Sequence, residues 1–218
     1  MALNKTKEDV NFVTILADGK LHMTVPEGTE GAVTRTYETS DGKQGSKTEL
    51  VFDDVVGQIT KMSFRDGDFG TSLNVEITDG DEKPVVLSLG TASNFGEDMM
   101  KKIFNVDLTK YVKIVPYAFV DETTKKNKRG ITIWQKDAEG KNQKIKNYFY
   151  DEKTEGPCNG YPEVPVAKKG KTISSDDWKL FFGLARKFMM EKMTEHFKLD
   201  EEQKSETEKA VEGEADGF

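Results

Sequence analysis

The sequence is poor in the residues that build disulfides, metal centres and membrane spans. Its 218 residues include one cysteine, Cys158, and two histidines, His22 and His196. A single cysteine excludes an intrachain disulfide and a cysteine-cluster zinc site, and it fits a reducing, cytoplasmic setting. No apolar run approaches the length of a membrane span, and the N-terminus lacks the apolar core of a signal peptide. We therefore expect a soluble protein of the cytoplasm.

Motifs of catalysis are missing as well. The chain has no phosphate-binding G-x-x-x-x-G-K-[ST], no dinucleotide-binding G-x-G-x-x-G and no H-E-x-x-H metal motif. Asp66, Asp68, Asp79 and Asp81 could form a carboxylate magnesium site of the kind that nucleases use. Each pair flanks a glycine in a turn sequence, where aspartate commonly bonds the local backbone, so we favour the turn. The sequence predicts no enzyme, no metal and no cofactor.

Charge is distributed unevenly along a chain whose net charge is −7. The segment 200–218 carries eight acidic and two basic residues, a net of −6, so the other 199 residues sum to −1. Within those, 125–146 carries eight basic residues against Asp137 and Glu139, a net of +6. A locally basic body with an acidic end favours a nucleic-acid partner.

The centre of the chain shows the alternation of short strands, interrupted by one helix. In the segment 71–78, for example, Leu73, Val75 and Ile77 fall on one face and polar residues on the other. The helix begins near Ser93 or Asn94, which can cap it. Five strands are predicted around it: Gly57–Arg65, Thr71–Thr78, Pro84–Leu89, Tyr111–Val120 and Gly130–Gln135.

This order, with the helix between the third and fourth strands, resembles the OB-fold, a five-stranded Greek-key barrel. In that family the sheet face and the loops between strands one and two and between strands four and five hold oligonucleotides. Here the four–five loop, 121–129, ends in a dense cluster of cations. The resemblance implies a mainly β protein with an OB barrel at its centre.

The flanking segments add strands before this core and a helix after it. Strands are expected around the Asp18-Gly19 turn, over 32–38, and over Lys144–Tyr150. A long helix is expected over 174–199, packed on the barrel or, alternatively, forming a homo-oligomer or partner surface. We therefore predict one domain over 1–199 and a disordered acidic tail over 200–218.

Aromatic residues lie beside cations on the polar faces of several strands. Alternation puts Ile131 and Ile133 in the core and turns Trp134 outward next to Lys136, and Phe119 could join the same surface. A positive groove with flat side chains is how single-stranded nucleic acid is held, although these aromatics could instead meet the C-terminal helix. The candidate binding residues are Arg35, Tyr37, Phe69, Lys113, Tyr117, Lys125, Lys126, Lys128, Arg129, Trp134, Lys136, Lys144, Lys146, Tyr148 and Tyr150.

The last residues, Glu212 to Phe218, form an acidic tip that ends in an aromatic residue. This tip resembles the tails of bacterial and phage single-stranded DNA-binding proteins, whose terminal aromatic docks on replication partners. Gly217 stands where the bacterial tails have proline, which is closer to the phage versions. The resemblance implies that Asp216 and Phe218 bind partner proteins.

Together these features predict a non-catalytic, phage-like protein that binds single-stranded DNA in replication, recombination or repair. If it is viral, its setting is the host cytoplasm. Two alternatives from other classes stay open: a carboxylate-dependent metal nuclease, and an OB-type protein-interaction or virion module.

Overall fold

The structure is a computed structural model that describes residues 10–39, 42–80, 82–167 and 172–199. The protein is mainly β, with a C-terminal helix, as the sequence predicted. The chain divides into two compact units, one of 1–99 and 106–145 and one of 100–105 and 146–218. We describe each unit separately, and a single domain over 1–199 stays a prediction. Neither helix in the described ranges is long and apolar enough to cross a membrane.

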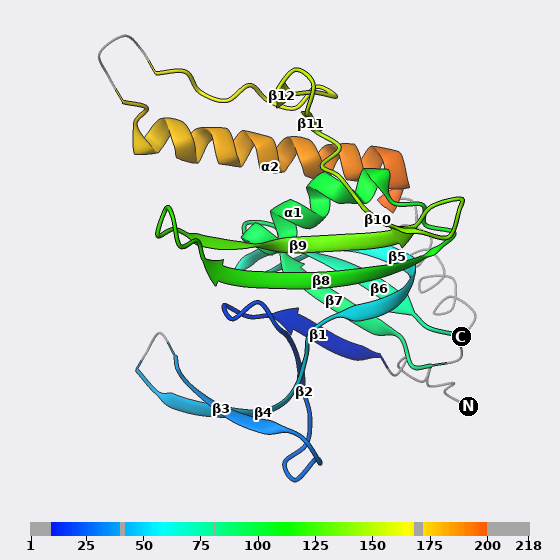
Figure 1. Cartoon of the computed structure of the whole chain (residues 1–218). Coiled ribbons are helices and arrows are strands. Elements are labelled where there is room, and N and C mark those ends of the chain that lie inside the picture. The colour runs from blue at the N-terminus through cyan, green and yellow to red at the C-terminus, as the bar shows by residue number, and fades with distance from the viewer. Residues whose placement is uncertain (1–9, 40–41, 81, 168–171, 200–218) are drawn as a thin grey trace, which may run out of the picture. The chain divides into compact units, whose positions relative to one another are not determined.

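The first unit contains a ten-stranded sheet (Figure 1). Its strands, in chain order, are β1 (Asn11–Ile15), β2 (Leu21–Thr24), β3 (Val33–Glu38), β4 (Gln44–Phe52), β5 (Val55–Gly67), β6 (Gly70–Thr78), β7 (Val85–Gly90), β8 (Tyr111–Val120), β9 (Asn127–Lys136) and β10 (Asn142–Lys144). Helix α1 (Asn94–Lys102) and the 3-10 turn η1 (Ile103–Asn105) follow β7 and contribute residues to both units.

The predicted order of three strands, a helix and two strands is confirmed as β5, β6, β7, α1, β8 and β9. Within the sheet these strands lie in the order β7-β6-β5-β8-β9, and all their pairings are antiparallel. Alternation explains the core, because the apolar members of each strand point inward together. Leu73 and Val75 of β6, Leu87 of β7, Ile114 of β8 and Ile133 of β9 are fully buried.

The sheet does not close into a barrel in the described part of the chain. It ends at β10 on one side and at β3 on the other. Beyond β7 the sheet continues with β1, which pairs with β7 in parallel, and then with β2, β4 and β3. The turn between β1 and β2 nevertheless approaches β8, since a Cβ on Gly19, whose φ is +74°, would overlap the backbone of Ala118. The N-terminal strands therefore extend the sheet and curl back toward β8.

The second unit is built around helix α2 (Ser175–Phe197). Ser174 caps its N-terminus in a reciprocal capping box with Asp177, and Lys198 ends it in the left-handed conformation. The helix lies where the sequence predicted one. Its buried stripe recurs every four residues: Phe181, Ala185, Met189 and Met193. A two-stranded sheet of β11 (Tyr150–Asp151) and β12 (Gly156–Pro157) completes this unit.

The predicted strand Lys144–Tyr150 is wrong in its extent. The backbone N–H of Ile145 still bonds Ile133 of β9, but the chain leaves the sheet immediately afterwards. Asn147 accepts a hydrogen bond from the backbone of Phe149 through its side chain, and the N–H of Tyr148 bonds the carbonyl of Lys101. An asparagine turn of this kind competes with strand pairing, and the apparent alternation of the sequence could not reveal it.

Candidate nucleic-acid interface

Strands β8 and β9 present one face to solvent. Their register pairs Lys113 with Trp134 and Phe119 with Lys128, and residues that face each other across a pair point to the same side. Along β8 the even positions 112 and 114 are buried, whereas the odd positions are partly or fully exposed. We call this surface the aromatic–basic face, and it consists of Tyr111, Lys113, Tyr117, Phe119, Lys128, Trp134, Lys136 and Lys144.

A row of three side chains crosses the middle of this face. Trp134 pairs with Lys113 of β8 on one side and with Lys144 of β10 on the other. Directly paired side chains lie about 5 Å apart at their Cβ atoms, so Trp134 has a lysine side chain on either side of it. Trp134 keeps 37% of its surface exposed. Its outward direction agrees with the alternation of Ile131 and Ile133, both of which are fully buried.

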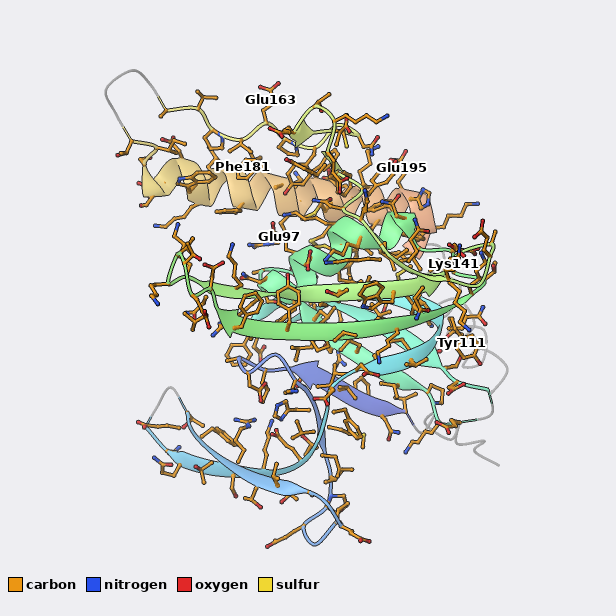
Figure 2. All side chains as sticks on the ribbon, viewed as in Figure 1. Glu97, Tyr111, Lys141, Glu163, Phe181 and Glu195 are labelled. Atoms are coloured by element: carbon orange, nitrogen blue, oxygen red, sulfur yellow. The ribbon has the colours of Figure 1, made fainter. Side chains whose placement is uncertain are left out.

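A groove of about 920 Å³ opens beside this row. Trp134 and Tyr111 both line it, and Tyr111 is 47% exposed. Polar groups at its rim come from Lys136 and Asn142. Figure 2 labels Tyr111 at the start of β8, at the end of the sheet where the β9–β10 turn carries Lys141. The groove therefore combines two exposed rings with hydrogen-bond donors, which suits an aromatic, anionic ligand.

The opposite end of the face is the turn between β8 and β9. Asp121 organises this turn, because its Oδ1 accepts hydrogen bonds from the backbone N–H groups of Thr123 and Thr124 and from the Thr124 hydroxyl. These bonds, chiefly those from Thr124, lower the pKa of the Asp121 carboxyl. The Asp121 carboxylate is thus used in hydrogen bonds within the turn. The cationic side chains in and next to the turn are exposed to solvent: Lys125, Lys126, Lys128 and Arg129.

The cations of this region differ in whether a carboxylate neutralises them. Lys113 pairs with Asp54, with 2.9 Å between Nζ and Oδ2, and Lys110 pairs with Asp107. By contrast, six cations of β9, β10 and the β8–β9 turn make no ion pair with any residue of the described ranges: Lys125, Lys126, Lys128, Arg129, Lys136 and Lys144. Of these, Arg129 pairs with Ala118 and points to the other side of the sheet from Trp134. In a chain of net charge −7, this local excess of unpaired positive charge favours an anionic partner.

Tyr117 and Phe119 extend the aromatic surface along β8. Their ring centroids lie 5.9 Å apart. Burial, together with the nearby Asp98 carboxylate, raises the pKa of the Tyr117 hydroxyl, so this residue stays neutral at physiological pH. Asp98 also accepts a hydrogen bond from the backbone of Ile131 at 2.7 Å, which ties α1 to β9 next to Tyr117 and Gly130.

Three predicted residues lie elsewhere in the first unit. Arg35 and Tyr37 are on β3, at the far end of the strand order, and Arg35 makes a two-pronged ion pair with the buried Glu49. Phe69 is fully exposed at the tip of the β5–β6 hairpin, between Asp68 and Gly70. An acidic neighbour repels phosphates, so the surroundings of Phe69 differ from those of the aromatic–basic face.

The remaining predicted residues belong to the second unit or lie outside the described residues. Tyr148 stacks on Phe104 with ring centroids 5.0 Å apart, and Lys146 pairs with Glu152. Tyr150 is exposed on β11. These three residues belong to the second unit, whereas Trp134 belongs to the first. The predicted partner-binding residues Asp216 and Phe218 lie outside the described ranges.

Sequence reasoning missed Tyr111 and Asn142. Tyr111 has the same parity on β8 as Lys113 and Tyr117, so strict alternation was a sufficient signal for it. Asn142 could not be found in that way, because it reaches the groove only through the short strand β10.

Two further observations concern metal binding and similarity to known proteins. No group of three or more histidine, cysteine or acidic side chains in the described ranges is placed to hold a metal ion. Comparison of the chain with protein-family models, with curated proteins and with solved structures finds no match.

Proposed function

We propose that this protein binds single-stranded DNA with little sequence preference, through the aromatic–basic face, without catalysis. The observation that carries the proposal is the row Lys113–Trp134–Lys144, an exposed indole with a lysine residue on either side, continued along β8 by further exposed rings. Cations along a groove meet the phosphates, and the rings stack on bases of any identity because every base has a π-face. Stacking needs bases that are not already paired, which favours a single strand over a duplex.

The strand order supports an OB-type core for this function. Strands β5, β6, β7, β8 and β9, with α1 after the third, follow the element order of that fold. In the described residues β7 pairs with β1 rather than with β9, so the proposed core is a partly open barrel whose gap the N-terminal strands occupy. The face on β8 and β9 and the basic β8–β9 turn would correspond to the sheet surface and four–five loop that bind oligonucleotides in that family.

The acidic C-terminal segment completes the proposal. Residues 200–218 carry a net charge of −6 and end in Phe218. We propose that this segment recruits replication or recombination proteins through Asp216 and Phe218. Because it is tethered to the chain, it would also compete with DNA for the basic face at high effective concentration.

The test is titration of the full-length protein with oligo(dT), with and without magnesium. We expect saturable binding and no cleavage, and cleavage would instead support a nuclease. Trp134→Ala should weaken binding by roughly 1–3 kcal/mol, the usual range for a base-stacking aromatic, with an unchanged melting temperature. Phe12→Ala is the matched control, because Phe12 is also exposed but lies on β1 of the same unit, which is not part of the face. Equal losses from both variants, or none from either, would refute the proposed face.

A further inference from the structure

The two edges of the ten-stranded sheet are built differently. At one edge, β10 has three residues, carries Lys144 and follows Lys141, which are common devices against edge-to-edge pairing. At the other edge, β3 has six residues, of sequence VTRTYE. It contains no proline and no lysine, its charges sum to zero, and it pairs with β4 without a bulge. Its β-branched and aromatic residues have high strand propensity, so this edge lacks the usual protection.

The backbone groups that β3 offers follow from its register. Thr39, next after the strand, donates its N–H to the carbonyl of Lys43 at 2.9 Å. Hydrogen-bonded and non-bonded pairs alternate in an antiparallel ladder. Tyr37 and Gly45 therefore form a hydrogen-bonded pair, and so do Arg35 and Lys47. The intervening residues of β3 then direct their N–H and C=O groups away from β4: Thr34, Thr36 and Glu38. No other strand in the described ranges pairs with this side.

We propose that this edge pairs with the same edge of a second copy of the chain, in an antiparallel two-fold arrangement centred on Thr36. In that register Thr36 faces Thr36 of the other copy, and Thr34 faces Glu38. Every outward backbone group of these three positions then finds a partner, which gives six hydrogen bonds across the seam by the antiparallel pattern. The result is one continuous sheet through both copies.

The side chains of β3 select this register. With the centre at Thr36, Arg35 lies opposite Tyr37 of the other copy, and no like charges face each other. Arg35 and Lys47 already approach the ring of Tyr37, at 5.7 and 5.8 Å from its centroid, so the ring accepts cations in this setting. Moving the centre to Arg35 would place two guanidinium groups opposite each other, which is unfavourable. Self-complementary charge therefore favours a second copy over an unrelated peptide.

The test is the oligomeric state of the full chain over a range of concentrations, measured by sedimentation velocity. We expect a monomer–dimer equilibrium, because a single strand pair is small for an interface. Thr36→Lys places two positive charges at the symmetry axis. The dimer dissociation constant of this variant should be at least about tenfold higher than that of the wild-type protein. Thr36→Glu should do the same with negative charges. Both substitutions are at an exposed side chain whose backbone does not bond β4, so the fold should persist.

Mixing the two variants is the decisive step. Equal amounts of Thr36→Lys and Thr36→Glu should form a heterodimer, because opposite charges now meet at the axis. Ser46→Lys is the matched control. Ser46 is exposed and lies directly opposite Thr36 on β4, so this substitution makes the same charge change one strand away from the seam. It should leave the dimer nearly unchanged.

Three results would overturn the proposal. One is a wild-type protein that is monomeric at every concentration. Another is a dimer that survives Thr36→Lys, which would direct attention to the exposed Leu180 and Leu184 of α2 instead. The third is a mixture of the two variants that stays monomeric while each variant is folded by circular dichroism. DNA binding plays no part in these measurements, so the result is independent of the proposed function.

Discussion

Two aromatic regions of this protein differ in what their rings contact. On β8 and β9 the rings lie at the surface among lysines, and Trp134 stands between Lys113 and Lys144. In the second unit the rings contact one another: Phe149 packs edge-on against Tyr148 and Phe188 at 5.1 and 5.6 Å. The first arrangement leaves π-faces available for a ligand, whereas the second uses them in packing. An aromatic residue next to a lysine in the sequence is therefore available to a ligand only where the chain stays in the strand and the alternation turns the ring to the surface.

The largest effect should come from the packed region. Phe149 is buried among four rings, and Phe149→Ala should lower the free energy of unfolding by about 3–5 kcal/mol through the cavity it leaves. Urea unfolding measures this loss. Under conditions where the variant is folded, its affinity for oligo(dT) should equal that of the parent. A variant with normal stability but reduced affinity would reverse the assignment of the two regions.

A second comparison is between cations that form an ion pair, such as Arg35, and cations of the aromatic–basic face that form none with any described residue, such as Lys144. Arg35 holds the buried Glu49 with both Nε and Nη2 at 2.9 Å, and His22 Nδ1 lies 3.1 Å from the same carboxylate. Glu49→Gln should cost about 2–3 kcal/mol of stability, since it leaves Arg35 without its charge partner, although partial exposure of Arg35 reduces the cost. Oligo(dT) affinity should not change.

The same carboxylate makes stability depend on pH. The Arg35 hydrogen bonds hold the pKa of Glu49 below its ordinary value. A lowered folded-state pKa contributes stability that is fully present above the unfolded-state pKa and is lost as the pH falls through the folded-state value. Unfolding free energy measured from neutral into acid solution should therefore fall less steeply for Glu49→Gln than for the parent. Parallel curves would show that the pKa of Glu49 is the same in the folded and the unfolded protein.

Within the aromatic–basic face, Tyr111 offers the sharpest test of what the structure adds. Tyr111→Ala should weaken oligo(dT) binding by roughly 1–3 kcal/mol, because the ring lines the groove beside Trp134. Tyr148→Ala should leave affinity unchanged, since that ring stacks on Phe104. Fluorescence anisotropy of labelled oligo(dT) gives both values. The opposite ranking would mean that the sequence-based choice of Tyr148 was better than the structural one.

The smallest effect is electrostatic. Lys144→Gln and Lys128→Gln each remove one unpaired cation, and each should reduce the steepness of the log–log salt dependence by roughly 0.7. Lys20→Gln is the matched control, because Lys20 is already paired with Asp53 and lies between β1 and β2, which are not part of the face. An equal change in slope for all three variants would indicate a diffuse charge effect rather than contacts on this face.

The fold and the candidate site were predictable to different depths. Alternation was sufficient for β6 and for most of β9, where the inward residues Ile131 and Ile133 are apolar and Gln135 is a buried polar exception, and it correctly turned Trp134 outward. The continuation of the sheet beyond β7 was not predictable, because the parallel pairing of β1 with β7 joins segments more than 70 residues apart and leaves no local pattern. Alternation also failed after Lys144, where the Asn147 side chain bonds the local backbone and ends the strand. Local chemistry of this kind decides whether a ring faces a ligand or a core.

The most direct test of the central claim uses the two tryptophans separately. In Trp178→Phe the remaining indole is Trp134, which lies on the aromatic–basic face, and in Trp134→Phe it is Trp178, which contacts Phe181 and Phe182 on α2. Each variant is titrated with oligo(dT) at low salt while tryptophan emission is recorded. The account predicts strong saturable quenching in Trp178→Phe and almost none in Trp134→Phe. If DNA binds Trp178→Phe and the emission of Trp134 does not change, the aromatic–basic face is not where the bases stack.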